Sequence, residues 1–92
     1  MAVIKLQREH QLGADTARAR VETIAKKLQK DLDAKYHWEG STLKFSRSGA
    51  SGYIQVGEHD IAVEIKLGML LSALKGKIEQ TLNDEIDQHL SA

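Results

Sequence analysis

The chain has 92 residues, which is enough for one domain with one hydrophobic core and little else. Its 13 Lys and Arg residues balance 13 Asp and Glu residues. This zero net charge argues against a nucleic-acid-binding domain, because such domains usually carry a strong positive charge. The sequence contains no cysteine, which excludes a disulfide framework, a thiolate metal site and a thiol nucleophile.

No apolar run in the sequence approaches the roughly 20 residues that a membrane-spanning helix needs. The N-terminal segment MAVIKLQREH also lacks the apolar stretch of a signal peptide. We therefore expect a cytoplasmic protein without a membrane span.

The first third of the chain is predicted to form a strand and then a helix. Residues 2–8 alternate between apolar and polar side chains, as a half-buried strand does. The segment that follows changes to a helical period. One apolar stripe recurs every three or four positions and contains Ala17, Val21, Ile24, Leu28 and Leu32.

Three short strands are predicted between residues 41 and 67. The segments STLKFSR (41–47), SGYIQVG (51–57) and DIAVEIKL (60–67) each place apolar side chains on one face. The links between them hold the Gly, Ser and Asp residues that hairpins require, and Glu39-Gly40 is a further turn signal before them. One-sided alternation predicts a sheet that is covered on one face and solvated on the other.

From Gly68 onward the period is helical again. A second apolar stripe contains Leu67, Leu71, Leu74, Ile78, Leu82 and Ile86. The predicted element order is therefore β-α-β-β-β-α, in a single α+β domain that spans residues 1–92. Because both helices and the sheet have one apolar face each, we expect an antiparallel four-stranded sheet with two helices packed on one face.

The side chains that catalysis or metal binding would need are present but not grouped. His10, His37, His59 and His89 do not pair at helical spacing, so we expect ordinary surface histidines. His10 and His37 are the two to follow, because they flank the first helix. No Gly-x-Ser-x-Gly elbow and no phosphate-binding loop occurs. We predict no catalytic, metal-binding or cofactor-binding residue, no cofactor, and a protein that is not an enzyme.

The charges of the two helices suggest a contact between them. Lys26, Lys27 and Lys30 lie toward the end of the first helix, and the acidic residues 84, 85 and 87 lie toward the end of the second. If the helices were parallel neighbours, these groups could pair; the alternative is a solvated surface of mixed charge.

The last helix carries a second, weaker feature. At 100° per residue, Met69, Ala73 and Gly76 fall together on the side opposite the core stripe, and Lys75 and Lys77 border them. A glycine inside a helix costs about 1 kcal/mol relative to alanine, which is consistent with a close approach by a second subunit, another protein or an apolar surface. These five residues are the candidate partner contact, and plain surface is the alternative.

Trp38, the single tryptophan, is the remaining candidate for a partner contact. It follows the first helix and precedes the turn signal. As a plug at the edge of the core it needs no further function, whereas an exposed Trp38 would mark a contact site.

Several short motifs, taken together, resemble a known family. They are His10-x-Leu12-Gly13, Ala17-Arg18-x-Arg20-Val21-Glu22, Trp38-Glu39-Gly40, Leu67-Gly68 and Leu71-x-Ala73-Leu74-Lys75-Gly76. In this combination the chain resembles the small bacterial polyhydroxyalkanoic acid system proteins over nearly its whole length.

The resemblance implies a non-enzymatic accessory or interaction protein that is associated with polyhydroxyalkanoate storage granules or their proteins. The implied partner is a protein or the polyester-granule surface, with a homodimer as a further option, and the implied location is the cytoplasm and the granule surface. The resemblance carries over no catalytic residue.

Two other functions stay open at this point. A ribosome- or RNA-binding module could share the order β-α-β-β-β-α, although zero net charge makes nucleic acid an unfavourable partner. A small carrier of apolar ligands would need a cavity that a chain of 92 residues can hardly provide.

Overall fold

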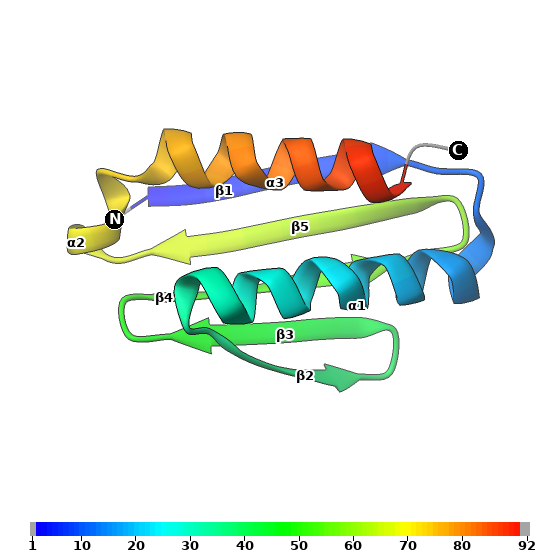
Figure 1. Cartoon of the computed structure of the whole chain (residues 1–92), viewed down its shortest axis with the longest axis horizontal. Coiled ribbons are helices and arrows are strands. Elements are labelled where there is room, and N and C mark those ends of the chain that lie inside the picture. The colour runs from blue at the N-terminus through cyan, green and yellow to red at the C-terminus, as the bar shows by residue number, and fades with distance from the viewer. Residues whose placement is uncertain (1, 91–92) are drawn as a thin grey trace.

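In the computed structural model, which describes residues 2–90 apart from the side chains of residues 31 and 32, five strands form one antiparallel sheet (Figure 1). The elements are β1 (Ala2–Glu9), α1 (Gly13–Leu32), β2 (Lys35–Glu39), β3 (Thr42–Arg47), β4 (Ala50–Val56), β5 (Asp60–Leu67), α2 (Met69–Ser72) and α3 (Lys75–Leu90). The strand order across the sheet is β1-β5-β4-β3-β2, so the first two strands of the chain form its two edges.

The predicted four-stranded sheet and its element order are wrong, because the strand β2 lies between α1 and β3. The sequence KYHWE offers only two inward positions, Tyr36 and Trp38, and both are half-buried because β2 is an edge strand. Such a short alternation is a weak signal. The turn signal at residues 39 and 40 is the β2–β3 hairpin, where Gly40 takes a φ of 62°, a conformation that favours glycine.

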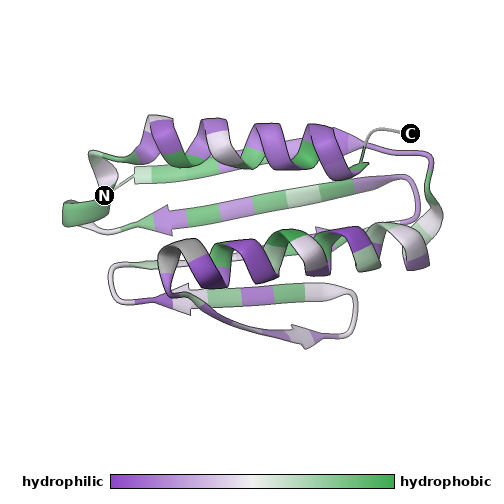
Figure 2. Cartoon of the chain, in the orientation of Figure 1, coloured by the Kyte–Doolittle hydropathy of each residue, from purple (hydrophilic) through white to green (hydrophobic). Residues whose placement is uncertain are grey.

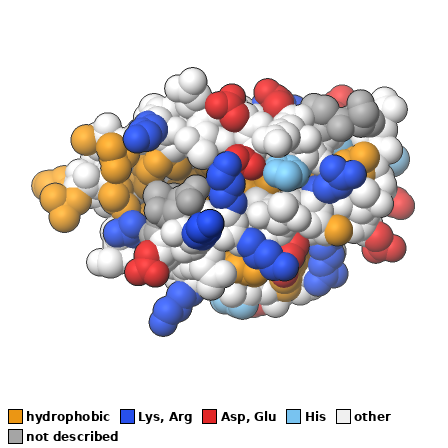
Figure 3. Space-filling view, in the orientation of Figure 1, with side chains coloured by type: hydrophobic (Ala, Val, Ile, Leu, Met, Phe, Trp, Pro, Cys, Tyr) orange, Lys and Arg blue, Asp and Glu red, His pale blue; other side chains and the backbone are white. Residues whose placement is uncertain are grey.

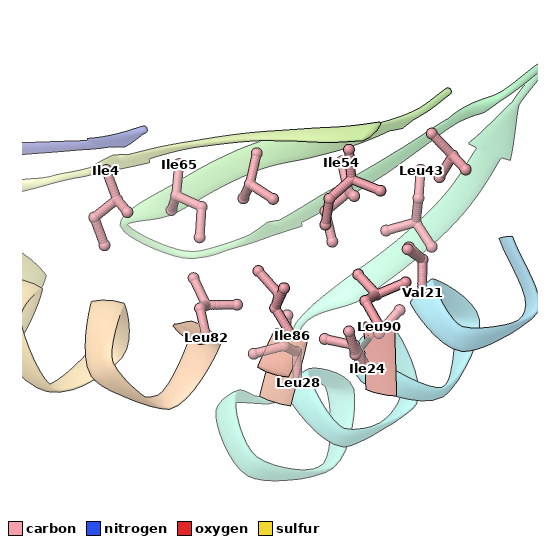
Figure 4. Close-up of a cluster of buried hydrophobic side chains, with 14 of the residues drawn as sticks. Ile4, Val21, Ile24, Leu28, Leu43, Ile54, Ile65, Leu82, Ile86 and Leu90 are labelled. Carbon is pink, nitrogen blue, oxygen red and sulfur yellow. The ribbon is translucent and has the colours of Figure 1, made fainter. Parts of the chain in front are cut away.

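The predicted α+β class is confirmed, and α1 and α3 lie over the same face of the antiparallel sheet (Figure 1). α1 packs on β4 and β2, and α3 packs on β1. Their buried side chains meet those of the sheet in one core, which includes Ile4, Val21, Ile24, Leu28, Leu43, Ile54, Ile65, Leu82, Ile86 and Leu90 (Figure 4). The side chain of Leu32, also predicted in the stripe of the first helix, lies outside the described part of the chain. Burial of this apolar area is the main stabilising term of the fold.

The segment predicted as one last helix is broken. Leu67 is the final residue of β5, α2 is a single turn, and residues 73 and 74 form a turn before α3. The break has a physical reason, because β5 and α3 run in opposite directions and the chain must reverse between them (Figure 1). Leu71 and Ile78 still pack against the core, but Leu74, expected in the core stripe, is 44% exposed.

The two long helices are antiparallel rather than parallel (Figure 1). The expected pairing of their charges nevertheless occurs at one position, where Lys27 of α1 forms an ion pair with Glu85 of α3. Asp87 instead pairs with Arg8 of β1, and Arg8 also donates a hydrogen bond to Asn83 at 2.9 Å. Side chains of α3 are therefore tied to both of its neighbours, α1 and β1.

Candidate functional site

The most exposed large apolar side chains lie in the segment between β5 and α3. Met69 and Leu70 of α2 are 82% and 92% exposed, and Leu74 of the following turn is the third member of the group. Figure 2 colours α2 as hydrophobic, and Figure 3 shows hydrophobic side chains protruding at that end of the molecule. We call Met69, Leu70 and Leu74 the apolar tip.

The structure places the five predicted contact residues of the last segment on this same end. Met69, Ala73, Lys75, Gly76 and Lys77 are all exposed. They do not form one helical strip, because Met69 belongs to α2 and Gly76 to α3, on opposite sides of the turn. A Cβ atom added at Gly76 would meet no heavy atom within 4 Å, so no described part of the chain approaches it closely.

Sequence reasoning missed Leu70, which is the most exposed member of the tip. The stretch MLLSAL contains more apolar residues than one helical stripe can bury, and this excess was the available signal. The prediction of one straight helix placed most of these residues in the core. In the structure the chain reverses here, and Leu70 and Leu74 are exposed.

A groove of about 280 Å³ runs between the two long helices beside the tip. Its apolar walls are Ile24 and Leu28 from α1, and Leu74 and Ile78 from the turn and α3. A smaller hollow of about 80 Å³ shares Leu28, Leu74 and Ile78 and continues toward the sheet residues Phe45, Ile65 and Leu67. These hollows adjoin the core but do not form a large enclosed cavity.

The polar groups of the groove lie at its edge. Glu85 is buried, and its two carboxylate oxygens face Lys27 and His89. Lys77 and Thr81 line the groove nearer the tip and are exposed. Among the side chains that the structure describes, Lys77 forms no ion pair, so its ammonium group is available to a ligand.

Trp38 lies far from the tip in the fold, on the edge strand β2, and it is half-buried against the core. Its indole Nε1–H donates to Glu22 at 3.1 Å, and the Arg18 guanidinium lies 4.5 Å from the ring centroid. These contacts join two of the sequence motifs, because Arg18 and Glu22 come from one and Trp38 from the other. Such contacts are those of an anchor between α1 and β2.

Among the groups that the structure describes, Tyr36, Tyr53 and Glu39 have clearly shifted pKa values. Burial, together with the charge of Glu22 and a hydrogen bond to it, raises the pKa of Tyr36. A hydrogen bond to Glu64, at 2.8 Å, raises the pKa of Tyr53, and hydrogen bonds from His37 and Lys44 lower the pKa of Glu39. Burial and nearby partners account for these shifts, and none of the three groups lies at the apolar tip.

His10 is buried, in contrast to the expectation of a surface residue. The Leu12 backbone N–H donates to its Nδ1 at 3.2 Å, so Nε2 carries the proton and donates to the Gly57 carbonyl at 3.0 Å. The histidine therefore links the β1–α1 turn to the β4–β5 turn. Both ring nitrogens have partners, which gives His10 a structural role.

No group of three or more His, Cys, Asp or Glu side chains in residues 2–90 is arranged to hold a metal ion. None of the helices that the structure describes is long and apolar enough to cross a membrane. The fold and its surface thus define a small α+β domain whose most prominent surface feature is an apolar tip beside a groove.

Comparison with known families identifies the group to which this domain belongs. A family model described as "Putative polyhydroxyalkanoic acid system protein (PHA_gran_rgn)" matches residues 4–90, and the chain belongs to this family. The family resemblance seen in the sequence motifs is confirmed, and the description names a storage-polymer system and no reaction. No curated protein and no solved structure is similar enough to this chain to count as a match.

The fold accounts for most of the family motifs. His10 joins two turns, Arg18 and Glu22 hold Trp38, and Gly68 donates its backbone N–H to the Gly49 carbonyl at 2.7 Å. A Cβ atom at Gly68 would lie 3.2 Å from that same oxygen, which favours glycine there. Among the described residues, Ala73 to Gly76 take part in no such side-chain hydrogen bond or ring contact, and all four of these motif residues are exposed.

Proposed function

We propose that this protein is a non-enzymatic accessory protein of polyhydroxyalkanoate storage and that it binds the granule surface through its apolar tip. The proposal joins the family membership to one observation on the structure. That observation is the exposure of three large apolar side chains, Met69, Leu70 and Leu74, within six residues.

The strong solvent exposure of these apolar side chains indicates an interaction site. Single exposed apolar residues are common on soluble proteins, but a contiguous apolar patch usually marks an interaction site or an aggregation hazard. Here two adjacent side chains are more than four-fifths exposed and a third lies five positions after the first. A polyester granule offers an apolar surface, and its protein coat offers apolar side chains, so either could bury the tip.

The surroundings of the tip suit a contact with a surface. Ala73 and Gly76 are small, and Lys75 and Lys77 add positive charge at the border of the apolar group. Small residues permit a close approach, and flexible lysine stems can follow an apolar surface while their ammonium groups stay in water. These features support a contact that is apolar at its centre and polar at its rim.

A homodimer through the same tip is the competing arrangement. The tip alone is much smaller than the roughly 800 Å² per partner of a standard stable interface. A dimer would therefore need additional surface from α3 or from an edge strand. Sedimentation of the free protein over a range of concentrations separates this arrangement from a monomer that binds granules.

The element order of the structure no longer supports the alternative of a ribosome- or RNA-binding module. It rested on the order β-α-β-β-β-α, whereas the described residues contain a fifth strand and a broken last helix. The zero net charge continues to oppose attraction to phosphates.

Co-sedimentation with granules tests the proposal. The double variant Met69→Asp/Leu70→Asp should reduce the bound fraction at least tenfold, because burying either side chain is worth about 1.5–3 kcal/mol and a charged replacement resists burial. The variant Met69→Ser/Leu70→Ser should also bind weakly, which separates loss of apolar area from added charge. Native granules and protein-free polyester particles, assayed side by side, distinguish a coat protein from the polymer as the binding surface.

The matched control adds the same two charges at the opposite end of the molecule. Gln11 and Gln88 are exposed polar residues of the β1–α1 turn and the end of α3. The variant Gln11→Asp/Gln88→Asp should bind granules as the natural chain does. Equal binding by all three variants would contradict the proposal, provided that circular dichroism shows each one to be folded.

A further inference from the structure

The groove between α1 and α3 is open at its rim and apolar at its base. Ile24 and Leu28 form one wall, and Leu74 and Ile78 form the other. The smaller hollow below it is lined almost entirely by apolar side chains and reaches the sheet. The two hollows share Leu28, Leu74 and Ile78, so the apolar lining extends from the groove toward the sheet.

The rim of the groove is positively charged at the end near the tip. Lys77 lies there without an ion-pair partner among residues 2–90, and the Thr81 hydroxyl lies one helical turn further along α3. Among the described residues that line the groove, the acid is Glu85, and its carboxylate already faces Lys27 and His89. The unneutralised charge at the rim is therefore positive, which favours an anionic ligand group.

We infer that this groove is a binding site for a carboxylate with a short to medium aliphatic chain. The aliphatic chain lies between Leu28 and Ile78, and the carboxylate accepts hydrogen bonds at the rim from Lys77 and Thr81. Apolar burial supplies most of the affinity, because an exposed lysine–carboxylate pair contributes little on its own. The carboxylate sets the orientation of the ligand.

The size of the groove limits the ligand. At about 280 Å³ it lies just below the usual range for small-molecule sites, so it fits one aliphatic chain rather than a peptide helix or a ring system. This is a surface groove beside a smaller apolar hollow, and it does not require the large internal cavity that a chain of 92 residues could hardly provide.

Two sources could provide this ligand chemistry. One is a free alkanoate or hydroxyalkanoate, and the other is the carboxylate end of a polyester chain at a granule. The second source rests on the proposed function, whereas the first does not. Leu74 and Lys77 belong both to the groove and to the end of the molecule that carries the tip, so the two contacts would lie side by side.

Titration with sodium octanoate, followed by amide chemical shifts of the whole chain and by calorimetry, tests the inference. We expect saturable shifts at residues 24–28 and 74–81. Lys77→Glu should weaken octanoate binding roughly threefold to tenfold, since it replaces a weak attraction by a repulsion. Lys75→Glu is the matched control, because Lys75 is an exposed lysine two residues away that does not line the groove, and it should change affinity less than twofold.

Two further ligands complete the test, one with a shorter aliphatic chain and one without the carboxylate. Butanoate should bind much more weakly than octanoate, and octan-1-ol should bind without sensitivity to Lys77→Glu. Octanoate that displaces the protein from granules would identify the polymer end as a source, and octanoate that binds without displacement would identify a free acid. Both results support a carboxylate site.

The inference fails if octanoate causes no saturable shifts in the groove, or if Lys75→Glu and Lys77→Glu weaken binding equally. That failure is separate from failure of the proposed function. The Met69→Asp/Leu70→Asp variant can lose granule binding in either case, and it should keep octanoate binding because neither residue lines the groove.

Discussion

His10 illustrates how one polar residue can determine the geometry of two turns. Its ring accepts a hydrogen bond from the backbone N–H of Leu12, the residue immediately before α1, and donates one to the Gly57 carbonyl in the β4–β5 turn. Its backbone N–H donates to the His59 carbonyl at 2.9 Å. A buried polar group whose hydrogen bonds are all satisfied stabilises one arrangement of the chain. Removal of the imidazole ring would leave the Leu12 amide and the Gly57 carbonyl without their hydrogen-bond partner.

We therefore expect His10→Ala to lower the free energy of unfolding by about 1–3 kcal/mol. His59→Ala is the control, because His59 is exposed in the β4–β5 turn and should change stability by less than about 0.5 kcal/mol. Urea denaturation of the three proteins provides the comparison. Equal stability of the two variants would show that the His10 hydrogen bonds do not hold the turns together.

The burial of His10 could not be predicted from its sequence neighbours. It follows a polar pair, Arg8 and Glu9, and its partner Gly57 lies 47 positions further along the chain. The partners of Trp38 were equally hidden, although Arg18 and Glu22 are one helical turn apart on α1. Side-chain contacts of this kind depend on strand order, which local patterns do not determine.

At the scale of the elements, local periodicity predicted the interior strands and the first helix well. Val63 and Ile65 alternate with polar residues on β5, and Ala17 and Val21 recur at helical spacing on α1, and all four are buried. The short edge strand β2 and the break after α2 were missed for a different reason. An edge strand needs few inward residues, and the break is caused by a chain reversal that a helical wheel does not represent.

The break between α2 and α3 changes the interpretation of Gly76. It is the second residue of α3 and lies in the first turn rather than in a helix interior, so the cost of glycine is lower than about 1 kcal/mol. Since a Cβ atom would meet nothing within 4 Å, the isolated domain gives no steric reason for glycine at this position. A partner that approaches closely would supply such a reason.

Gly76→Ala should raise the free energy of unfolding by about 0.5 kcal/mol and weaken granule binding if the partner approaches this residue. Gly52→Ala is the contrasting variant, because its Cβ would lie 2.4 Å from the Glu64 carbonyl oxygen and 3.0 Å from Ile65 Cα, and it should be clearly destabilised. Thermal denaturation measures both changes. A loss of stability in Gly76→Ala would reveal a requirement for glycine within the domain itself.

At the scale of the whole molecule, α3 is the element that closes the domain. It covers β1, which is the first strand of the chain, and it lies antiparallel to α1, which packs on β4 (Figure 1). The pairing of β1 with β5 joins residues more than fifty positions apart. The candidate groove exists only because this long-range assembly sets α1 and α3 side by side, which is why no single motif predicts it.

The ion pair between Lys27 and Glu85 allows this assembly to be tested with adjacent positions of one helix. Glu85 is buried between the helices, whereas Asp84 is exposed. Glu85→Lys would place a second ammonium group beside Lys27 and remove the carboxylate that faces His89, and we expect a loss of about 2–4 kcal/mol. Asp84→Lys, which makes the same change of charge one residue earlier, should alter stability by less than about 0.5 kcal/mol.

Both variants change the net charge by the same amount, so a difference between them measures the local contact rather than the overall charge. The loss in Glu85→Lys should be partly restored by Lys27→Glu in the same chain, because the reversed pair recovers the attraction between α1 and α3. Urea denaturation of the two single variants and the double variant provides the measurement. Equal losses at positions 84 and 85 would mean that the helices are held together by apolar packing alone, without a contribution from this pair.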